Sequence, residues 1–567
     1  MSLTGALHIG ATGISVNQAA LEVVGNNLSN SATEGYSRQR AIMAAGPGVE
    51  ISAGTFVGSG VRLQSIVRVV DEALNARVRT ATSDQQAALA RQNILSQVES
   101  IEGELSDQGL STRLSTFLNQ WSELASNPND TGVKSLVIAQ GQSLSEHLQQ
   151  MRTELANLRK QVDSSLASGV EVANGLLTQV ADLNRRIALE ESGQGGANSL
   201  RDERDRVLDE LAEYVNITTH EQPSGQIDVF VDSTPIVLGT ESRGLELETV
   251  TEDGELITKL RVQADGTQLT PSGGQLGQLL VTRNNDINPA IAEVDQFAST
   301  LIFELNKLHS SGQGSSAFTS LTGASLNLDP TAALNDQVAN DLPFEIVNGS
   351  FQIHVTQKTT GADVATQIDV DLDGLGADTT LNDLAAAIDA VANISASVNP
   401  DGTLSITSDS SDYTFSFSDD SSGALASLGL NTFFTGRDAA SIDVNEILVD
   451  DPGYLAVGSD HVAGSNGTAL AIAGVADQSL DSLNGLSLNQ AWKKHVEELA
   501  VQTATANQNV EASTIIVESL TNQKASVSGV SVDEETINLL QFQRAFQGSA
   551  RFISVVDELM QTLLGLV

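Results

Sequence analysis

Hydrophobic residues recur at heptad spacing at both ends of the chain. Near the C-terminus, one heptad position holds Leu539, Phe546, Ile553, Met560 and Val567, and its companion holds Phe542, Ser549, Val556 and Leu563. Near the N-terminus, the same spacing relates Leu7, Ile14, Leu21 and Leu28, with weaker companions at Leu3, Gly10, Asn17 and Val24. Such a seam is typical of a helix that packs along another helix. We therefore predict that the two terminal helices pair as a coiled coil.

These seams allow two interpretations. Heptad stripes usually belong to an ordinary core, so the two ends could simply close a helical bundle. Alternatively, the paired ends pack against copies of themselves in an assembly. Spacing alone favours the first interpretation.

The middle of the chain contains long helical patterns. The longest runs from Val133 to about Glu191, with the apolar register Leu148, Met151, Leu155, Leu158, Val162, Val172, Leu176 and Leu183. Glycines between 193 and 196 end it, and shorter stripes follow over 199–211, 287–308 and 488–524. A short strand and a helix are expected between Val61 and Glu104, with an apolar stripe that reaches Leu105. We interpret the charged block Leu200–Asp205 as a solvated helix face with local ion pairs.

Two stretches change to period two, which is typical of half-buried strands. The first lies between Ile217 and Leu269, and the second covers residues 343–457 around a short helix at Leu381–Ala392. We therefore predict a multidomain α+β protein. Residues 1–60 with 526–567 form the terminal coiled-coil domain, and residues 61–215 with 275–342 and 458–525 form a long-helix bundle domain. Residues 216–274 and 343–457 form two inserted, mainly antiparallel β domains.

Composition narrows the class of protein. A chain of 567 residues is too long for a single core. Its net charge of −43 argues against nucleic acid and anionic membranes as partners, because both need a surplus of Lys and Arg. Between Gly361 and Asp460 the acidic residues outnumber the basic ones eighteen to one, which is typical of a solvated outer surface. No apolar run of about eighteen residues exists that could insert into a membrane.

Motifs for catalysis or ligand binding are missing from the sequence. The chain has no cysteine, its seven histidines are scattered, and no nucleotide-binding or nucleophile motif occurs. The run Asp369–Gly374 matches the first half of a calcium loop, but the twelfth position is Thr380 instead of Glu. Its alternation favours a strand with an acidic outer face. We expect no enzyme activity, no cofactor and no metal ion.

The two ends resemble the flagellar axial protein family of rod, hook and hook-associated proteins. The N-terminal signature is Asn26-Asn27-Leu28-Ser29-Asn30, followed by Thr33 and Gly35-Tyr36. The C-terminal signature runs from Glu535 to Phe546, with Phe542 and Phe546 where the family often has Tyr. The long helix followed by Leu200–Asp205 resembles the hook-associated branch that joins hook to filament.

This resemblance implies a structural junction protein of the bacterial flagellum, secreted through type III export and assembled as a homo-oligomeric layer. It implies three further partners: the hook protein, a second junction hook-associated protein, and an export chaperone at the C-terminal helix. The expected assembly interface comprises Leu7, Ile14, Leu21, Asn27, Leu28, Asn30, Gly35, Tyr36, Leu539, Phe542, Phe546, Ile553, Val556, Met560 and Leu563. The alternatives are a rod or hook component, and a secreted adhesin or binding protein with a helical stalk.

Overall fold

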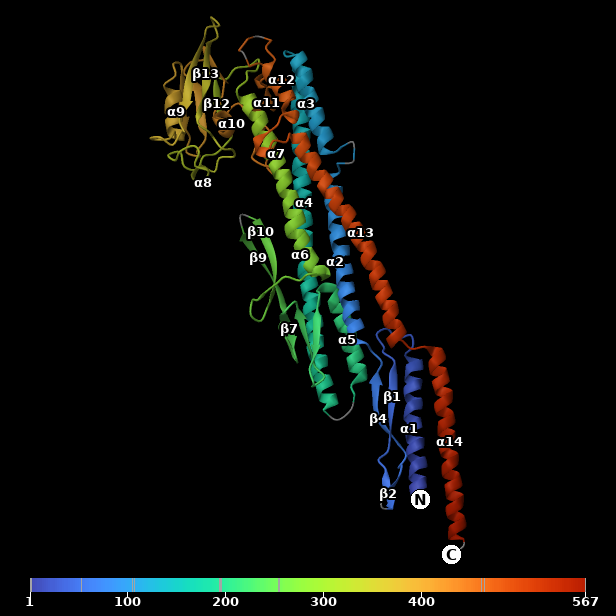
Figure 1. Cartoon of the computed structure of the whole chain (residues 1–567). Coiled ribbons are helices and arrows are strands. Elements are labelled where there is room, and N and C mark those ends of the chain that lie inside the picture. Colours follow the sequence, from blue (N-terminus) through green and yellow to red (C-terminus); the bar gives the residue numbers. More distant parts are fainter. Residues whose placement is uncertain are drawn as a thin grey trace. The chain divides into compact units, whose positions relative to one another are not determined.

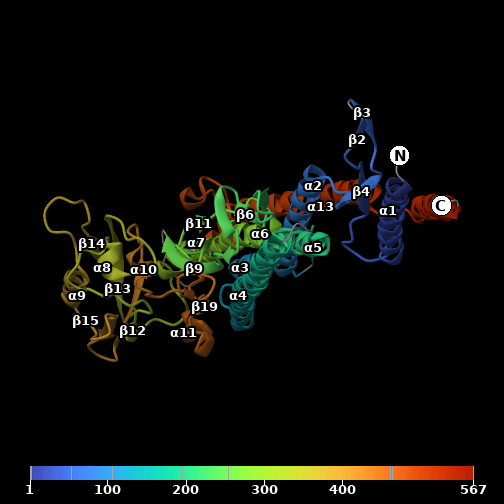
Figure 2. The same cartoon turned by 90° about the horizontal axis from the view of Figure 1, so that it is seen from below.

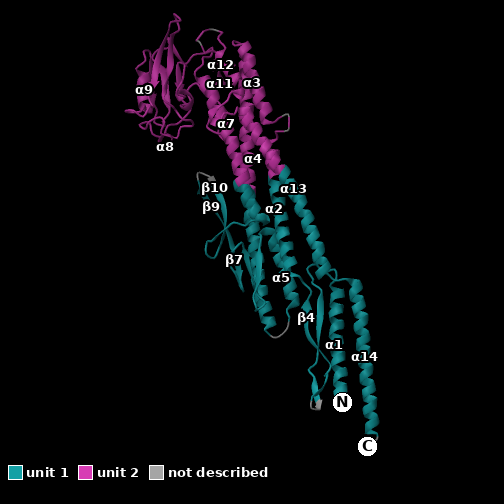
Figure 3. Cartoon of the chain, in the orientation of Figure 1, with its two compact units in different colours: residues 1–94, 162–284, 504–567 teal, residues 95–161, 285–503 magenta. Residues whose placement is uncertain are grey.

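The computed structural model describes residues 3–52, 54–104, 106, 108–192, 196–252, 255–459, 461–462 and 464–565. Figure 3 shows two compact units, formed by residues 1–94, 162–284 and 504–567 and by residues 95–161 and 285–503. The fold is mixed α/β, with long helices and several small antiparallel sheets. The four-domain division expected from the sequence stays a prediction. Three sequence expectations, at Leu105, 193–195 and Val567, lie outside the described residues.

Unit 1 contains both ends of the chain. Helix α1 (Leu3–Ser29) lies between a two-stranded ribbon and helix α14 (Val532–Leu564), as the views in Figures 1 and 2 agree. The ribbon pairs β1 (Gln39–Ala45) antiparallel with β4 (Val61–Arg68), and the hairpin of β2 (Val49–Ser52) and β3 (Thr55–Val57) lies between them in sequence. Because α1 is covered on two sides, it carries no charged residue except Glu22 and needs no charged face.

Small residues make the closest contact between α1 and α14. A Cβ atom at Gly10 would lie 2.5 Å from Ile553 Cγ1, and one at Gly13 would lie 2.8 Å from Ser549 Oγ. Near the other end of α1, Asn27 contacts Glu535, so the two helices run antiparallel. The apolar residues that recur at heptad spacing near the N-terminus lie beside this contact and are only half-buried. They are Leu7, Ile14, Leu21 and Leu28. The helices therefore meet through two glycines, of which Gly10 is a companion position of the expected seam and Gly13 lies outside it.

Helix α4 (Thr131–Glu191) is continuous over 61 residues, about 90 Å at 1.5 Å per residue. Its expected apolar stripe is buried from Leu148 to Val162. Beyond that point the buried line continues through Leu166 and Val170, and the expected Val172 is 41% exposed. A straight helix drifts by about 20° per heptad from a strict seven-residue repeat. The expected Leu176 and Leu183 are nevertheless buried, so the strict register predicted from the sequence holds only in part in the second half of this helix.

Other helices complete the scaffold. They are α2 (Glu72–Glu102), α5 (Asn198–Tyr214), α6 (Gly274–Thr282), α13 (Leu488–Ser528) and a π-helical turn at Arg283–Ile287. Two small sheets accompany them in unit 1. The first orders β5 (Thr218–Glu221), β6 (Ile227–Val231), β7 (Thr234–Leu238) and β8 (Glu241–Ser242) side by side. The second places β10 (Glu255–Val262) between β9 (Leu245–Glu252) and β11 (Gln268–Leu269).

Asparagine side chains fasten these sheets to the helical scaffold. Each accepts a hydrogen bond from the backbone N–H of one strand residue and donates to the C=O of the same residue. The pairs are Asn174 with Leu245, Asn184 with Ile227, and Asn284 with Thr258. An amide side chain suits this role because it carries both an acceptor and donors.

Unit 2 contains a β-rich segment with its own core. One sheet places β13 (Gly349–Gln357) between β14 (Asp363–Val370) and β17 (Tyr413–Ser418), and the other places β16 (Leu404–Ser408) between β12 (Ser320–Thr322) and β15 (Ile394–Val398). Helix α9 (Leu381–Asp389) begins with a capping box at Thr380. Phe351, Phe415 and Phe417 are fully buried in this core. Strand β14 ends at Val370, so only the first two residues of the acidic run Asp369–Gly374 lie in the expected strand, and the chain bends over 373–377.

The remaining elements of unit 2 are shorter, apart from two helices. They are α3 (Leu110–Ser126), α7 (Asn288–Ser310), α8 (Gln337–Asn340), α10 (Ala424–Ser427), β18 (Phe434–Thr435), β19 (Asp443–Val444), α11 (Glu446–Asp450), α12 (Gly467–Ala473) and 3₁₀ turns at Pro452–Tyr454, Val475–Asp477 and Asp481–Leu483. Asn306 in α7 makes the same pair of hydrogen bonds as the three asparagines of unit 1. It accepts from Phe434 N–H and donates to Phe434 C=O.

Candidate assembly site at the joint of the two chain ends

Asn27 lies at the centre of the joint between the two chain ends. Its Oδ1 accepts hydrogen bonds from Tyr36 Oη at 2.8 Å and from Gln39 N at 3.0 Å. Its Nδ2 donates to Gln39 O and to Glu535 Oε2, both at 2.9 Å. Asn27 and Glu535 are each 1% exposed. The N-terminal and C-terminal signatures thus meet in one buried hydrogen-bond network.

Arg38 supplies the positive charge that the buried Glu535 requires. Arg38 Nη2 lies 2.8 Å from Glu535 Oε1, and Arg38 Nη1 lies 2.8 Å from Glu534 Oε2. Arg38 also donates its backbone N–H to Ser528 O at 2.9 Å. A buried carboxylate without a partner would cost several kcal/mol, so this ion pair is necessary for the joint to close.

The glycine of the N-terminal signature has a conformational role. Gly35 has φ +77°, a left-handed value that disfavours residues with a Cβ atom. Its turn brings the chain from the end of α1 back to the ribbon and places Tyr36 beside Asn27. Burial, followed by the charges of Asp202 and Glu535, raises the pKa of Tyr36 to about 12. Tyr36 therefore remains a neutral hydrogen-bond donor.

A second cluster of charges fastens α5 to the ribbon and to α2. Arg68 Nη1 lies 2.9 Å from Asp202 Oδ1 and 2.7 Å from Asp205 Oδ2. Arg79 Nη2 lies 3.2 Å from Asp205 Oδ1. Burial acts to raise the pKa of Asp205, but Arg68 and Arg79 outweigh it and hold that pKa below its ordinary value. Asp205 is therefore ionised and paired at neutral pH.

This cluster corrects the sequence interpretation of Leu200–Asp205. Asp202, Arg204 and Asp205 are buried rather than solvated. Asp202 and Asp205 pair with arginines more than a hundred residues away, and Arg204 donates to Asn184 Oδ1 and Gly225 O. The spacing of charges within the block predicts ion pairs along one helix. The arginines that actually pair with Asp202 and Asp205 lie far away in the sequence, so the block itself cannot reveal them.

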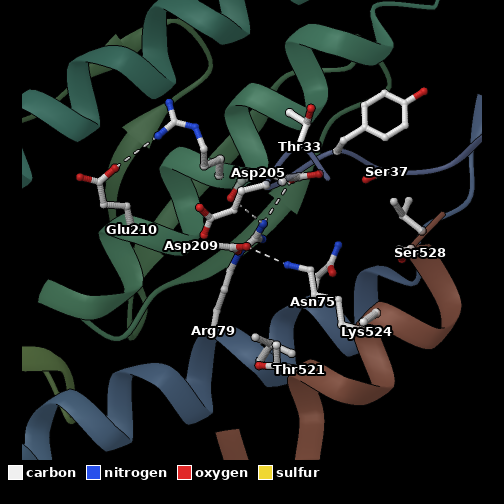
Figure 4. A pocket seen from close by; sticks show the side chains of 18 of the residues that line it. Thr33, Ser37, Asn75, Arg79, Asp205, Asp209, Glu210, Thr521, Lys524 and Ser528 are labelled. Atoms are coloured by element: carbon white, nitrogen blue, oxygen red, sulfur yellow. Dashed lines mark hydrogen bonds and ion pairs between the residues drawn. The ribbon is translucent and has the colours of Figure 1, made fainter. Parts of the chain in front are cut away.

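A cavity of 610 Å³ lies beside the joint. Its wall comes from the loop over 30–37, from α2 and α5, and from the end of α13. Figure 4 shows Arg79 and Lys524 near Asp209, and the amide of Asn75 pointing into the space. The charged residues of the wall are Glu34, Arg79, Asp205, Arg206, Asp209, Glu210, Glu213 and Lys524. The wall is therefore polar and carries more acidic than basic groups.

The expected interface residues occupy different environments. Asn27 and Val556 are buried, and Leu563 is 53% exposed. The C-terminal seam otherwise faces inward: Leu539, Phe542, Phe546, Ile553 and Met560 are half-buried. Asn30 accepts from Thr33 and donates to Asn26, so it stabilises the end of α1. Only Asn27 and Tyr36 of the expected set enter the buried network.

Sequence reasoning missed Glu535 and Arg38 as members of this site. Glu535 begins the C-terminal signature and lies in the first turn of α14, which Ser531 caps by accepting from Glu534 N. However, Glu535 also precedes Leu539 by four residues, so it occupies a seam position. An acidic residue in an otherwise apolar seam was the available signal.

A second stripe on α14 has no cover in the chain itself. The exposed fractions are 65% at Ile537, 50% at Leu540, 49% at Val555 and 52% at Leu559. Arg544, Gly548 and Arg551 continue the same three- and four-residue spacing between them. Within the described residues, neither Arg544 nor Arg551 has an ion pair. One face of α14 is thus available for contacts outside this chain.

The described part of the chain offers no inorganic site. It contains no group of three or more His, Asp or Glu residues placed to hold a metal ion. None of its helices has the length and apolarity needed to cross a membrane. The contacts observed at the joint are hydrogen bonds and ion pairs between chain segments.

Comparisons with known proteins cover the same regions. Residues 95–323 match the family described as the flagellar hook-associated protein FlgK helical domain, and residues 521–566 match the flagellar basal body rod FlgEFG protein C-terminal family. A relative from Escherichia coli, flagellar hook-associated protein 1, is 25% identical over 98% of each chain. Its namesake from Bacillus subtilis is 24% identical over 97% of this chain and 96% of that protein.

A solved structure to which this chain is similar is that of the flagellar hook junction protein FlgK from Burkholderia pseudomallei. It covers 80% of this chain and 100% of its own at 14% identity, with a TM-score of 0.49. The sequence relatives align from end to end, and the matched C-terminal family contains Glu535 and the α14 seam. Nearly the whole chain is thus similar in sequence to flagellar hook-associated protein 1, and its residues 95–323 match the helical-domain family of that protein.

Proposed function

We propose that this chain is a structural junction component that joins the hook to the filament of the bacterial flagellum. The observation that carries the proposal is the buried network of Asn27, Tyr36 and Glu535, which unites the two end signatures. It makes the chain ends one rigid unit whose outer surface can be repeated around a tube. We propose a structural role without enzyme activity.

The proposed assembly uses the two terminal helices. Helices α1 and α14 pair as a coiled coil, and the exposed stripe of α14 packs against other copies in a homo-oligomeric layer. The expected interface set named above takes part in this assembly, with its buried and half-buried members holding the two ends of the chain together and its exposed members, such as Leu563, on the outer surface. An exposed stripe costs solubility in a free subunit, so its presence over several turns supports a partner.

The remaining partners follow from the same role. The layer binds the hook protein on one side and a second hook-associated junction protein on the other. Before assembly, the apolar face of α14 is covered by an export chaperone, and the chain reaches the cell exterior through type III export. The acidic β-rich domain, residues 343–457, faces solvent because its charges repel close neighbours of like sign.

Electron microscopy of cells that lack this gene tests the proposal, with flagellin assayed in the medium. We expect hooks without filaments and unpolymerised flagellin outside the cell, both corrected by the intact gene. Normal filaments would remove the junction role and favour a secreted binding protein. Absence of the hooks themselves would move the assignment to the rod or hook.

A further inference from the structure

The cavity beside the joint contains acidic groups without a counter-ion. Arg79 and Lys524 pair with Asp205 and Asp209, and Arg206 lies 3.8 Å from Glu210. Glu34 and Glu213 complete the wall, and neither has an ion pair within the described residues. Burial, and then the charge of Glu210, raises the pKa of Glu213. Glu34 and Glu213 are both exposed to solvent, so a cation that entered the cavity would meet two accessible carboxylates that no described residue pairs with.

Asn75 provides an independent indication that the cavity can bind a group from outside this chain. The residue is 4% exposed and lines the cavity, and its amide points into it (Figure 4). Within the described residues, the side-chain amide of Asn75 has no hydrogen-bond partner. The amide faces the open cavity, so it is free to bond with a group that enters it. An amide oxygen and two carboxylates together form an acceptor set.

The exposed stripe of α14 provides matching donors. Arg544 and Arg551 lack ion pairs although the chain contains 72 acidic residues. They are seven residues apart and therefore share one face of the helix. Uncovered apolar residues lie on both sides of them along the stripe: Ile537 and Leu540 before, and Val555 and Leu559 after. An exposed apolar face of this kind requires a partner. The middle of the partner's contact surface has to carry acceptor groups that can pair with the two arginines.

We propose that Arg544 or Arg551 of one copy inserts its guanidinium group into this cavity of a second copy, against Glu34, Glu213 and Asn75. The inference rests on the proposed function, because it requires copies packed side by side. Arginine suits the acceptor set since its planar group carries five N–H donors and stays charged. The cavity is thus a socket for the neighbouring subunit.

The positions of the two partners set the stagger between copies. Residues Ser528–Val530 line the cavity immediately before α14 begins. Arg544 and Arg551 follow Ser531 by 13 and 20 residues, which is about 20 and 30 Å along a helix. A copy whose arginine enters the cavity is therefore displaced along α14 by about 20–30 Å. Such a stagger builds a helical array rather than a flat ring.

Disulfide cross-linking tests this contact directly, because the natural chain has no cysteine. Glu213→Cys is combined with Arg551→Cys or with Arg544→Cys in the full chain, and hook–filament structures are isolated and oxidised. We expect dimers and longer ladders with at least one combination. The matched control, Glu171→Cys with the same arginine positions, changes an unpaired exposed glutamate outside the cavity and should give no ladder.

The outcomes separate the inference from the function on which it rests. If the protein is present in isolated hook–filament structures and neither combination gives a ladder above the control, the socket is wrong and the junction role stands. If the protein is absent from those structures, the proposed function fails, and the socket fails with it.

Charge exchange provides the second readout. We expect Arg544→Glu with Arg551→Glu to reduce filament-bearing cells at least tenfold, and Glu213→Arg to reduce them similarly. All three substitutions together should restore at least part of the loss. Arg77→Glu, an exposed unpaired arginine that does not line the cavity, serves as the control for charge alone. Failure of the combination to restore any filaments, with normal folding by circular dichroism, would overturn the pairing.

Discussion

The β-rich segment of unit 2 and helix α14 of unit 1 use their apolar residues in opposite ways. In β13, alternate residues Phe351, Ile353 and Val355 are buried to 5% exposure or less against the facing strands. In α14, only Glu535 and Val556 are buried among 33 residues. The first region completes its own core. The second leaves several apolar side chains exposed and attaches to its own chain through its half-buried seam, the close contact at Gly10 and Gly13, and the ion pairs and hydrogen bonds of the joint.

The charges follow the same division. The acidic excess is concentrated in residues 361–460, where Arg437 is the single basic residue among eighteen acids. In α14, three of the five acids occupy the first turn, where they suit the helix N-terminus. Like charges on an outer surface favour solubility, whereas a helix that packs against copies of itself needs a surface of low charge. The comparison suggests four tests.

The largest effect is expected from truncation in the β-rich core. Phe417→Ala removes a side chain that is 0% exposed and packs against Phe351 and Phe415. We expect this domain to lose about 3–5 kcal/mol of unfolding free energy, because a cavity replaces a buried ring. Urea unfolding followed by circular dichroism measures it. Val364→Ala on the neighbouring strand, 63% exposed, is the control and should change less than about 0.5 kcal/mol.

Acid should destabilise unit 2 through His309. Its Nδ1 lies 2.8 Å from Asn431 O and its Nε2 accepts from Ala456 N at 3.0 Å, so the ring is neutral. Burial lowers the pKa of His309 to about 4. The unfolded chain binds this proton near pH 6.5 and the folded chain does not. Stability is therefore complete above pH 6.5 and falls by about 3 kcal/mol as the pH drops towards 4.

The fluorescence of Trp121, whose ring centroid lies 6.3 Å from that of His309, reports this transition in urea. The variant His309→Gln should flatten the pH dependence, whereas His220→Gln in unit 1 should leave it unchanged. An equally steep dependence in His309→Gln would show that other groups cause the acid sensitivity. Such a result would also weaken the view that unit 2 depends on its fully buried polar groups.

A smaller, local effect is expected at the joint. Asn27→Ala leaves Gln39 N–H and the Glu535 carboxylate without an amide partner, at a cost of about 1–3 kcal/mol. Hydrogen exchange should accelerate at Gln39 and in the second half of α1, while unit 2 stays protected. Asn26→Ala, an exposed neighbour, is the matched control. If both variants exchange alike, the buried network does not hold the joint.

The smallest effect on the stability of the free chain is expected for a residue of the exposed stripe on α14. The same change should have a large effect on assembly. Leu559→Ala shortens a side chain that is 52% exposed, so the unfolding free energy should change by less than about 0.5 kcal/mol. Filament-bearing cells should nevertheless become rare, because the lost contact belongs to the assembled state. If the free chain instead melts several degrees lower, the stripe is part of the monomer core.

Much of this architecture could be predicted from local patterns. The inward line of α14 follows the heptad positions from Leu539 to Met560, and the long helix, the small sheets and the helix at Leu381 all lie where their periodicities place them. Periodicity succeeds here because it records which side of an element is buried. It cannot record what covers that side.

Contacts between distant segments explain the expectations that were wrong. The apolar residues at N-terminal heptad spacing do not make the closest contact with α14. Gly10 and Gly13 make it, because only residues without a bulky side chain allow α14 to approach so closely. Asp202 and Asp205 proved to be buried because Arg68 and Arg79 arrive from another element. Likewise, two histidines distant in sequence, His354 and His461, stack with ring centroids 3.7 Å apart.

By itself, the sequence determined the long helices, the β-rich stretches, the acidic excess of residues 361–460 and the two end signatures. Each depends on residue type and spacing along one segment, where side-chain direction follows from helix or strand geometry. The tertiary structure alone decided that Asn27, Tyr36 and Glu535 share one buried network, and that a cavity with an unpaired Asn75 lies beside it. Hydrogen bonds between residues 508 positions apart depend on chain path, which no local pattern encodes.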